Sequence, residues 1–112
     1  MEIDIRADGF LPTDTLREHI RRCLGAAGRR FHTHVRSLQV VLLPGARIGN
    51  SGSWTGPKRC VLKAEVTNVG VVEVGARSYD LYQAVSRAVK RLRRVVTSRH
   101  PRPEGQPLKK PA

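Results

Sequence analysis

The segment SYDLYQAVSRAVKRLRRVV, residues 78–96, has an apolar side and a basic side when it is placed on a helix. At about 100° per residue, one arc of this helix is apolar and holds Leu81, Val85, Ala88, Leu92, Val95 and Val96. The opposite arc holds Arg87, Lys90, Arg91, Arg93 and Arg94, with no acid among them. Solvated helix faces usually mix charges of both signs, because opposite charges four residues apart stabilise the helix. The pattern therefore predicts an amphipathic helix whose outer face suits a polyanion.

A second amphipathic helix is predicted from Thr13 to about Phe31. Thr13 is a suitable N-cap, and Asp14 suits the positive end of the helix dipole. The apolar stripe of this helix consists of Leu16, Ile20, Cys23, Leu24, Ala27 and Phe31. The cations that point away from the stripe are Arg17, Arg21, Arg22 and Arg29. Gly25 and Gly28 are the positions at which this helix would end early, because glycine is a poor helix former.

Four segments are predicted to be strands, and three of them, all except residues 35–43, alternate between apolar and polar residues in the manner of half-buried strands. They are Glu2–Ala7, Val35–Leu43, Arg59–Thr67 and Val71–Arg77. Asn68–Gly70 makes a tight turn that joins the last two strands into a hairpin. The resulting order, β-α-β-β-β-α, predicts an α+β fold in which a four-stranded, mainly antiparallel sheet carries both helices on one face.

We expect one domain over residues 1–100, because a chain of 112 residues is too short for two independent cores. The Gly- and Ser-rich segment Pro44–Pro57 is predicted to be a long mobile loop. Residues 101–112 are basic and rich in proline, and they are predicted to form a disordered tail.

Three aromatic side chains have two interpretations each. Trp54, in the Gly-rich loop, either stacks on an unpaired base or is a plug folded back on the sheet. Tyr79 and Tyr82 suit base stacking as well, although Tyr82 lies at the edge of the apolar stripe and is predicted to be a packing residue.

The charge balance indicates the class of partner. The chain has 21 Lys and Arg residues against 9 acids and a formal net charge of +12, so a compact fold is under self-repulsion unless an anion binds it. Nucleic acid is the leading partner and a membrane surface the second. No apolar run is long enough to span a membrane, and the start of the chain does not resemble a signal peptide. We therefore expect a cytoplasmic protein.

Catalytic and metal-binding motifs are absent from the sequence, so no enzyme activity, cofactor or metal is predicted. His32 and His34, with His19, lack the neighbouring acid or thiolate pair of a metal site and are predicted to be surface residues. Cys23 and Cys60 both fall on inward sides of the predicted elements, which favours free buried thiols. Asp80 is predicted to be an acid in the first turn of the helix over residues 78–96, where it serves the helix dipole.

Two short segments resemble one protein family. TDTLREHI, residues 13–20, resembles the start of the first helix of the bacterial ribosome hibernation-promoting factors, which are also called ribosome-associated inhibitor or ribosomal subunit interface proteins. EVGARSYDLYQAV, residues 73–85, is similar to the final strand and second helix of these proteins, including their Asp-(Leu/Met)-Tyr signature. The chain matches the short form, which has no C-terminal dimerisation domain.

The resemblance implies a fold of the double-stranded-RNA-binding type and a translation inhibitor that acts under stress. Such proteins occupy the messenger and transfer RNA channel of the small ribosomal subunit, with basic helix faces against ribosomal RNA. On this chain the implied RNA-binding residues are Arg17, Arg21, Arg22, Arg29, Arg87, Lys90, Arg91 and Arg94, and Trp54 is added as a stacking candidate. The partner implied is the small subunit, without a small-molecule substrate or a membrane.

Two other functions fit the same residues. A general binder of structured RNA would use the same basic faces through shape and phosphate contacts. A protein-interaction module would instead use the open sheet face or an edge strand. Equal affinity for RNA of any origin favours the former, and salt-insensitive association with a protein favours the latter.

Overall fold

The structure is a computed structural model that describes residues 1–48 and 53–99. Its main sheet has the strand order β1-β2-β5-β6, formed by β1 (Glu2–Ala7), β2 (Val35–Leu43), β5 (Lys58–Val66) and β6 (Gly70–Ser78). β1 pairs with β2 in parallel, because the chain crosses over through helices between them, and the other two pairings are antiparallel. The predicted α+β fold class is confirmed. The predicted tail, residues 101–112, lies outside the described residues.

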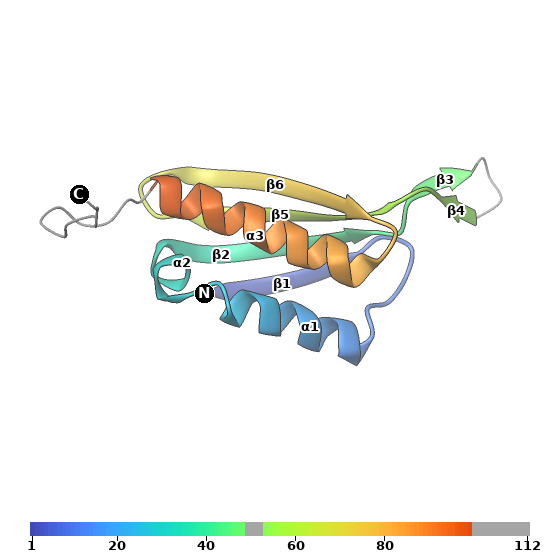
Figure 1. Ribbon diagram of the computed structural model, residues 1–112, viewed down its shortest axis with the longest axis horizontal. Helices are drawn as coiled ribbons and strands as arrows, with labels where there is room; N and C mark the ends of the chain where they lie inside the picture. The colour runs from blue at the N-terminus through green and yellow to red at the C-terminus, as the bar shows by residue number, and fades with distance from the viewer. Residues whose placement is uncertain (49–52, 100–112) are drawn as a thin grey trace, which may run out of the picture.

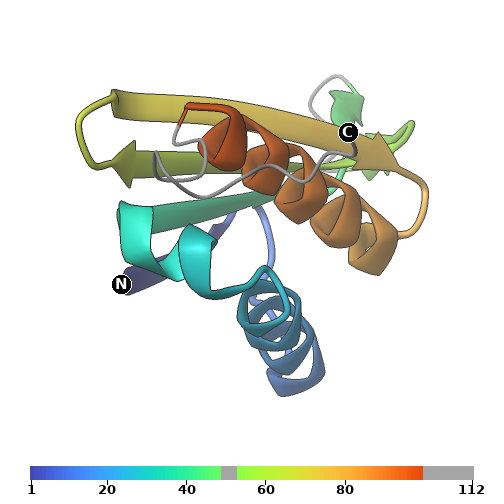
Figure 2. The same cartoon turned by 60° about the vertical axis from the view of Figure 1, so that its left-hand side comes forward.

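Within the described residues, three helices lie on one face of this sheet and none lies on its other face (Figures 1 and 2). They are α1 (Asp14–Gly25), α2 (Arg29–His34) and α3 (Leu81–Arg99). The helix predicted to reach about Phe31 is wrong in its extent, because α1 ends at Gly25, one of the two glycines at which an early end was expected, and a separate short helix follows. Gly28 precedes α2 with a φ of 100°, a left-handed conformation that glycine adopts without steric cost. The chain therefore turns between the two helices.

The core lies between the helices and the inner face of the sheet. α1 contributes Leu16, Ile20 and Leu24, while Phe31 of α2 is fully buried. The alternation predicted for β5 is confirmed, since its inward residues are all buried; they are Cys60, Leu62, Ala64 and Val66. Buried residues of α3 complete the core and are Ala84, Val85, Ala88, Val89, Leu92 and Val96.

The segment predicted as a long loop contains a second small sheet. β3 (Ala46–Ile48) and β4 (Ser53–Thr55) pair antiparallel and project beyond one end of the main sheet (Figure 1). The prediction that the whole segment is a loop is wrong for these strands, whereas residues 49–52 lie outside the described residues. The Gly and Ser content of the segment concealed two short strands.

Trp54 packs against the turn that follows β1. A Cβ atom placed on Gly9 would lie 2.6 Å from Trp54 Cζ2, and Gly9 has a φ of 86°. The indole is half-buried. The structure therefore shows the packing alternative for Trp54, against the Gly9 turn, and a role in RNA binding stays a prediction.

The two cysteines differ in their surroundings. Cys60 is fully buried, and burial, with a smaller contribution from Cys23, raises the pKa of the Cys60 thiol from the ordinary 9.0 to about 12. Cys23 is only half-buried, so the prediction of two buried thiols is wrong for it. Both are free thiols, as predicted.

We expect Cys60 to lower the stability of the protein in alkaline solution. Below pH 9 the thiol is protonated in both states and makes no pH-dependent contribution. Between pH 9 and 12 it ionises only in the unfolded chain, so the free energy of unfolding falls by up to about 1.4 kcal/mol per pH unit. Urea unfolding of the wild type and of Cys60→Ala at pH 8 to 10 measures this difference in slope. Equal slopes for the two proteins would contradict the assignment.

Candidate nucleic-acid interface

Side-chain caps set the first residues of both long helices. Thr13 Oγ1 accepts a hydrogen bond from the N–H of Leu16 at 3.1 Å, as expected for the N-cap of α1. Asp80 Oδ1 accepts one from the N–H of Tyr82 at 3.0 Å. Asp80 is thus the N-cap of α3. The helix begins at Leu81, so the predicted start at Ser78 is wrong. The capped ends of α1 and α3 lie at the same end of the molecule (Figure 1).

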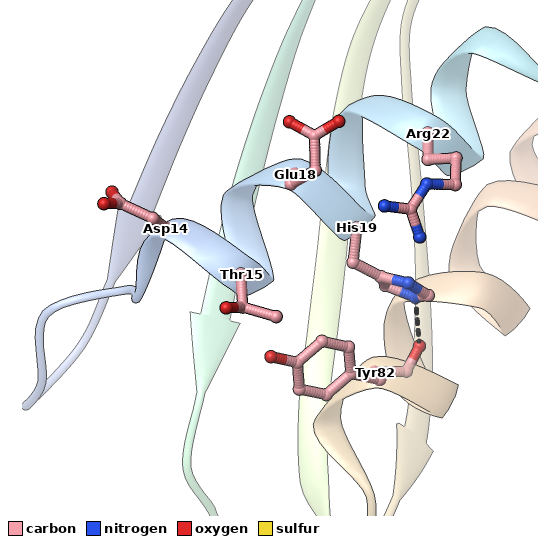
Figure 3. Close-up of a pocket in the computed structure, with 6 residues that line it drawn as sticks. All are labelled: Asp14, Thr15, Glu18, His19, Arg22 and Tyr82. Atoms are coloured by element: carbon pink, nitrogen blue, oxygen red, sulfur yellow. Dashed lines mark hydrogen bonds between the residues drawn. The ribbon is translucent and has the colours of Figure 1, made fainter.

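Four side chains connect α1 to α3 and are called here the interhelical clamp: His19, Cys23, Tyr82 and Ser86. His19 Nε2 lies 3.0 Å from the carbonyl oxygen of Tyr82 and 3.2 Å from Ser86 Oγ. Since a carbonyl only accepts, His19 Nε2 carries the hydrogen. The rings of His19 and Tyr82 meet edge to face at 4.9 Å, and Figure 3 shows His19 pointing at α3. The prediction of a surface position is wrong for His19, which is half-buried.

Replacing His19 by alanine is expected to destabilise the protein by about 1–2 kcal/mol, because the mutation leaves the Ser86 hydroxyl without this partner and removes an aromatic contact. Urea unfolding of His19→Ala, Ser86→Ala and the double variant measures the coupling between the two helices. Leu11→Ala, which truncates a side chain that is 89% exposed and lies outside the clamp, is the control. Strictly additive effects of the His19 and Ser86 substitutions would show that these two side chains are not coupled across the helices.

The cations of α3 divide into two groups by their contacts. Arg87 Nη1 donates to the carbonyl oxygen of Arg77 at 3.1 Å, and Arg91 Nη1 donates to that of Gly75 at 2.5 Å. β6 is an edge strand, so these arginines cover backbone groups that have no neighbouring strand. Arg87 and Arg91, both predicted RNA-binding residues, are therefore held beside the sheet edge.

The second group faces the other two helices. Lys90, Arg93 and Arg94 line a hollow together with Arg30 of α2. These four residues are called the central basic surface. Lys90 and Arg93 also line the groove between α1 and α3, whose remaining lining consists of Cys23, Ala26, Ala27, Ser86 and Val89. Among the residues that the structure describes, every charged side chain that lines the two hollows is a cation.

Arg30 and Arg93 are members of this surface that the sequence-based list of RNA-binding residues omits. Arg93 already lies on the predicted basic arc of the helix. Arg30 belongs to α2, a helix that the prediction merged with α1. Helical spacing along one continuous helix therefore did not predict that Arg30 lies beside α3. A break at Gly28 is the signal in the sequence that points to this arrangement.

The arginines of α1 are less closely gathered than predicted. Arg22 lines a hollow beside His19 and Tyr82 at the junction with α3, together with Asp14, Thr15 and Glu18 (Figure 3). Helical spacing puts Arg17 and Arg21 on the side of α1 away from His19. Arg29, at the start of α2, is exposed. Arg22 is therefore the predicted α1 cation that lies at the junction of the two helices.

Comparison with known proteins identifies the family. Residues 3–102 match the family model described as sigma 54 modulation protein / S30EA ribosomal protein. The chain belongs to this family. The S30EA family consists of ribosome-associated proteins and is non-catalytic.

Solved structures share the fold of this S30EA family member. The N-terminal domain of Protein Y from Thermus thermophilus has a TM-score of 0.69 and 24% identity, with 88% of this chain and 98% of that chain covered. A ribosomal subunit interface protein from Coxiella burnetii has a TM-score of 0.72 and 15% identity, with 91% and 100% covered. No curated protein matches the chain by sequence.

Within residues 1–48 and 53–99, no cluster of three or more His, Cys, Asp or Glu side chains is arranged to hold a metal ion. In the same residues, no helix is both long and apolar enough for a membrane crossing.

Proposed function

We propose that this S30EA family member binds the small ribosomal subunit in the channel used by messenger and transfer RNA and thereby stops translation under stress. The partner is ribosomal RNA, and the protein acts in the cytoplasm. Membership of a ribosome-associated family supports the ribosome as the partner. The central basic surface is the observation that carries the proposal.

Charge and shape at this surface both suit an RNA backbone. Lys90, Arg93 and Arg94 belong to the acid-free basic arc of α3, and Arg30 adds a cation from α2. Each cation that neutralises a phosphate releases condensed counterions, which makes binding strong and steeply dependent on salt. An arginine can also place two donors on one phosphate.

The groove between α1 and α3 gives an RNA backbone room to approach the protein. Three of the side chains that line it are small, namely Ala26, Ala27 and Ser86. Lys90 and Arg93 supply the positive charge of the lining. The interhelical clamp holds the two sides of this groove at one separation, because His19 contacts both the backbone and a side chain of α3. A preformed groove avoids part of the ordering cost of binding.

Chemical footprinting of ribosomal RNA on purified ribosomes tests the proposal. We expect the wild-type protein to protect small-subunit nucleotides that contact messenger and transfer RNA, and to inhibit a cell-free translation system. Protection confined to other regions would contradict the proposed location. Equal affinity for ribosomes and for unrelated folded RNA would instead show a general binder of structured RNA.

A further inference from the structure

A separate hollow lies where β6 leads into α3, on the same side of α3 as the sheet edge. Its lining includes Pro57, Arg77, Tyr79, Asp80, Gln83 and Arg87. Tyr79 is 75% exposed, so its ring is not part of the core. Lys90, Arg93 and Arg94, which carry the proposed phosphate contacts, do not line this hollow.

The polar groups of the hollow are oriented by contacts within the protein. Ser78 Oγ donates to Gln83 Oε1 at 2.9 Å, so the amide nitrogen of Gln83 retains its two N–H donors. Arg87 uses Nη1 for the carbonyl oxygen of Arg77, and a guanidinium has further N–H groups for an anion. Asp80 is held by its capping bond to Tyr82. The hollow thus combines an exposed aromatic ring, amide donors and a cation.

We propose that this hollow binds one unpaired RNA nucleotide, with the base stacked on Tyr79, the Gln83 amide donating to the base edge and Arg87 contacting the adjacent phosphate. Aromatic rings stack on the faces of unpaired bases, and arginine suits the phosphates that flank them. The inference rests on the proposed function, because it specifies one kind of RNA element that the protein recognises. It adds an unpaired nucleotide to the phosphate contacts made by the central basic surface.

The test compares two RNA probes of equal charge. One is a hairpin with a single-stranded adenosine extension, and the other carries abasic riboses in the same extension. Fluorescence anisotropy at fixed salt gives the affinity of the purified protein for each. The wild type is expected to bind the probe with bases about tenfold more tightly, the scale of one base stacked on an aromatic ring.

Three variants identify the ring responsible. Tyr79→Phe is expected to keep the preference for bases, and Tyr79→Ala to reduce it to less than about twofold. Leu11→Ala is the matched control, because Leu11 is 89% exposed and does not line the hollow. A preference that Tyr79→Ala retains, or a wild type that binds both probes equally or binds neither, would overturn the inference.

Sedimentation with ribosomes separates this inference from the proposed function. A wild type that sediments with the small subunit but shows no preference for bases leaves the proposed function intact and removes the nucleotide site. A wild type that prefers bases but fails to sediment with the small subunit supports the nucleotide site and removes the ribosomal assignment.

Discussion

Replacing Lys90 and Arg93 by glutamate is expected to weaken binding to the small ribosomal subunit by about a hundredfold at physiological salt. Both residues line the hollow shared with Arg30 and the groove between the helices. Removing a phosphate contact costs roughly fivefold under these conditions through lost counterion release, and the reversed charges add repulsion. Binding is measured by co-sedimentation with purified subunits over a series of salt concentrations.

A control variant with the same change in net charge distinguishes the contribution of this surface to binding from the effect of overall charge. Arg6→Glu with Lys63→Glu alters two exposed cations on the open face of the sheet, opposite the helices. We expect this control to bind within about threefold of the wild type, because only general steering is reduced. The helix variant should also show a shallower dependence of affinity on salt, by nearly one unit of slope per lost contact. Equal losses in the two variants would show that net charge alone drives binding.

Truncating Phe31 to alanine is expected to destabilise the protein by about 3–5 kcal/mol, the usual cost of removing a buried aromatic ring. Phe31 is fully buried in the core. The helix that carries it, α2, has only 6 residues and is too short to be stable by itself. Phe31 therefore anchors α2, and urea unfolding measures the loss.

Two comparisons refine this prediction. Leu11→Ala removes an exposed side chain and is expected to change stability by less than about 0.5 kcal/mol. At temperatures where Phe31→Ala remains folded, its ribosome affinity should also fall, because Arg30 on α2 is no longer held beside Lys90 and Arg94. A loss below about 1 kcal/mol would contradict the anchoring role.

The periodicity of the sequence predicted most of the fold. Alternation along the strand around Leu62 marked the inward residues correctly, because a half-buried strand must place its apolar side chains on one face. In β2 the register shifts between Val35 and Ser37, so Val35 is buried out of phase with Leu38. The same argument assigned the apolar stripe of α3. It failed between Gly25 and Arg29, where an apolar spacing continued across a turn and concealed the separate helix α2.

Periodicity of the sequence could not identify the two short strands. β3 and β4 have 3 residues each, which is too few for alternation to be distinguished from chance in a Gly- and Ser-rich segment. The side on which Trp54 packs was equally open, since its contact, Gly9, lies far away in the sequence.

The sequence predicted which kind of residues form the candidate site, but not how these residues are arranged in space. Helical spacing in residues 78–96 identified an acid-free basic face, since the positions of side chains around one helix depend only on their order. Tertiary packing decided which cations act together: it directed Arg87 and Arg91 to the edge of β6 and brought Arg30 to Arg94. It also joined His19 to Tyr82, 63 residues away, because contacts between distant segments depend on how whole helices pack, which no local pattern encodes.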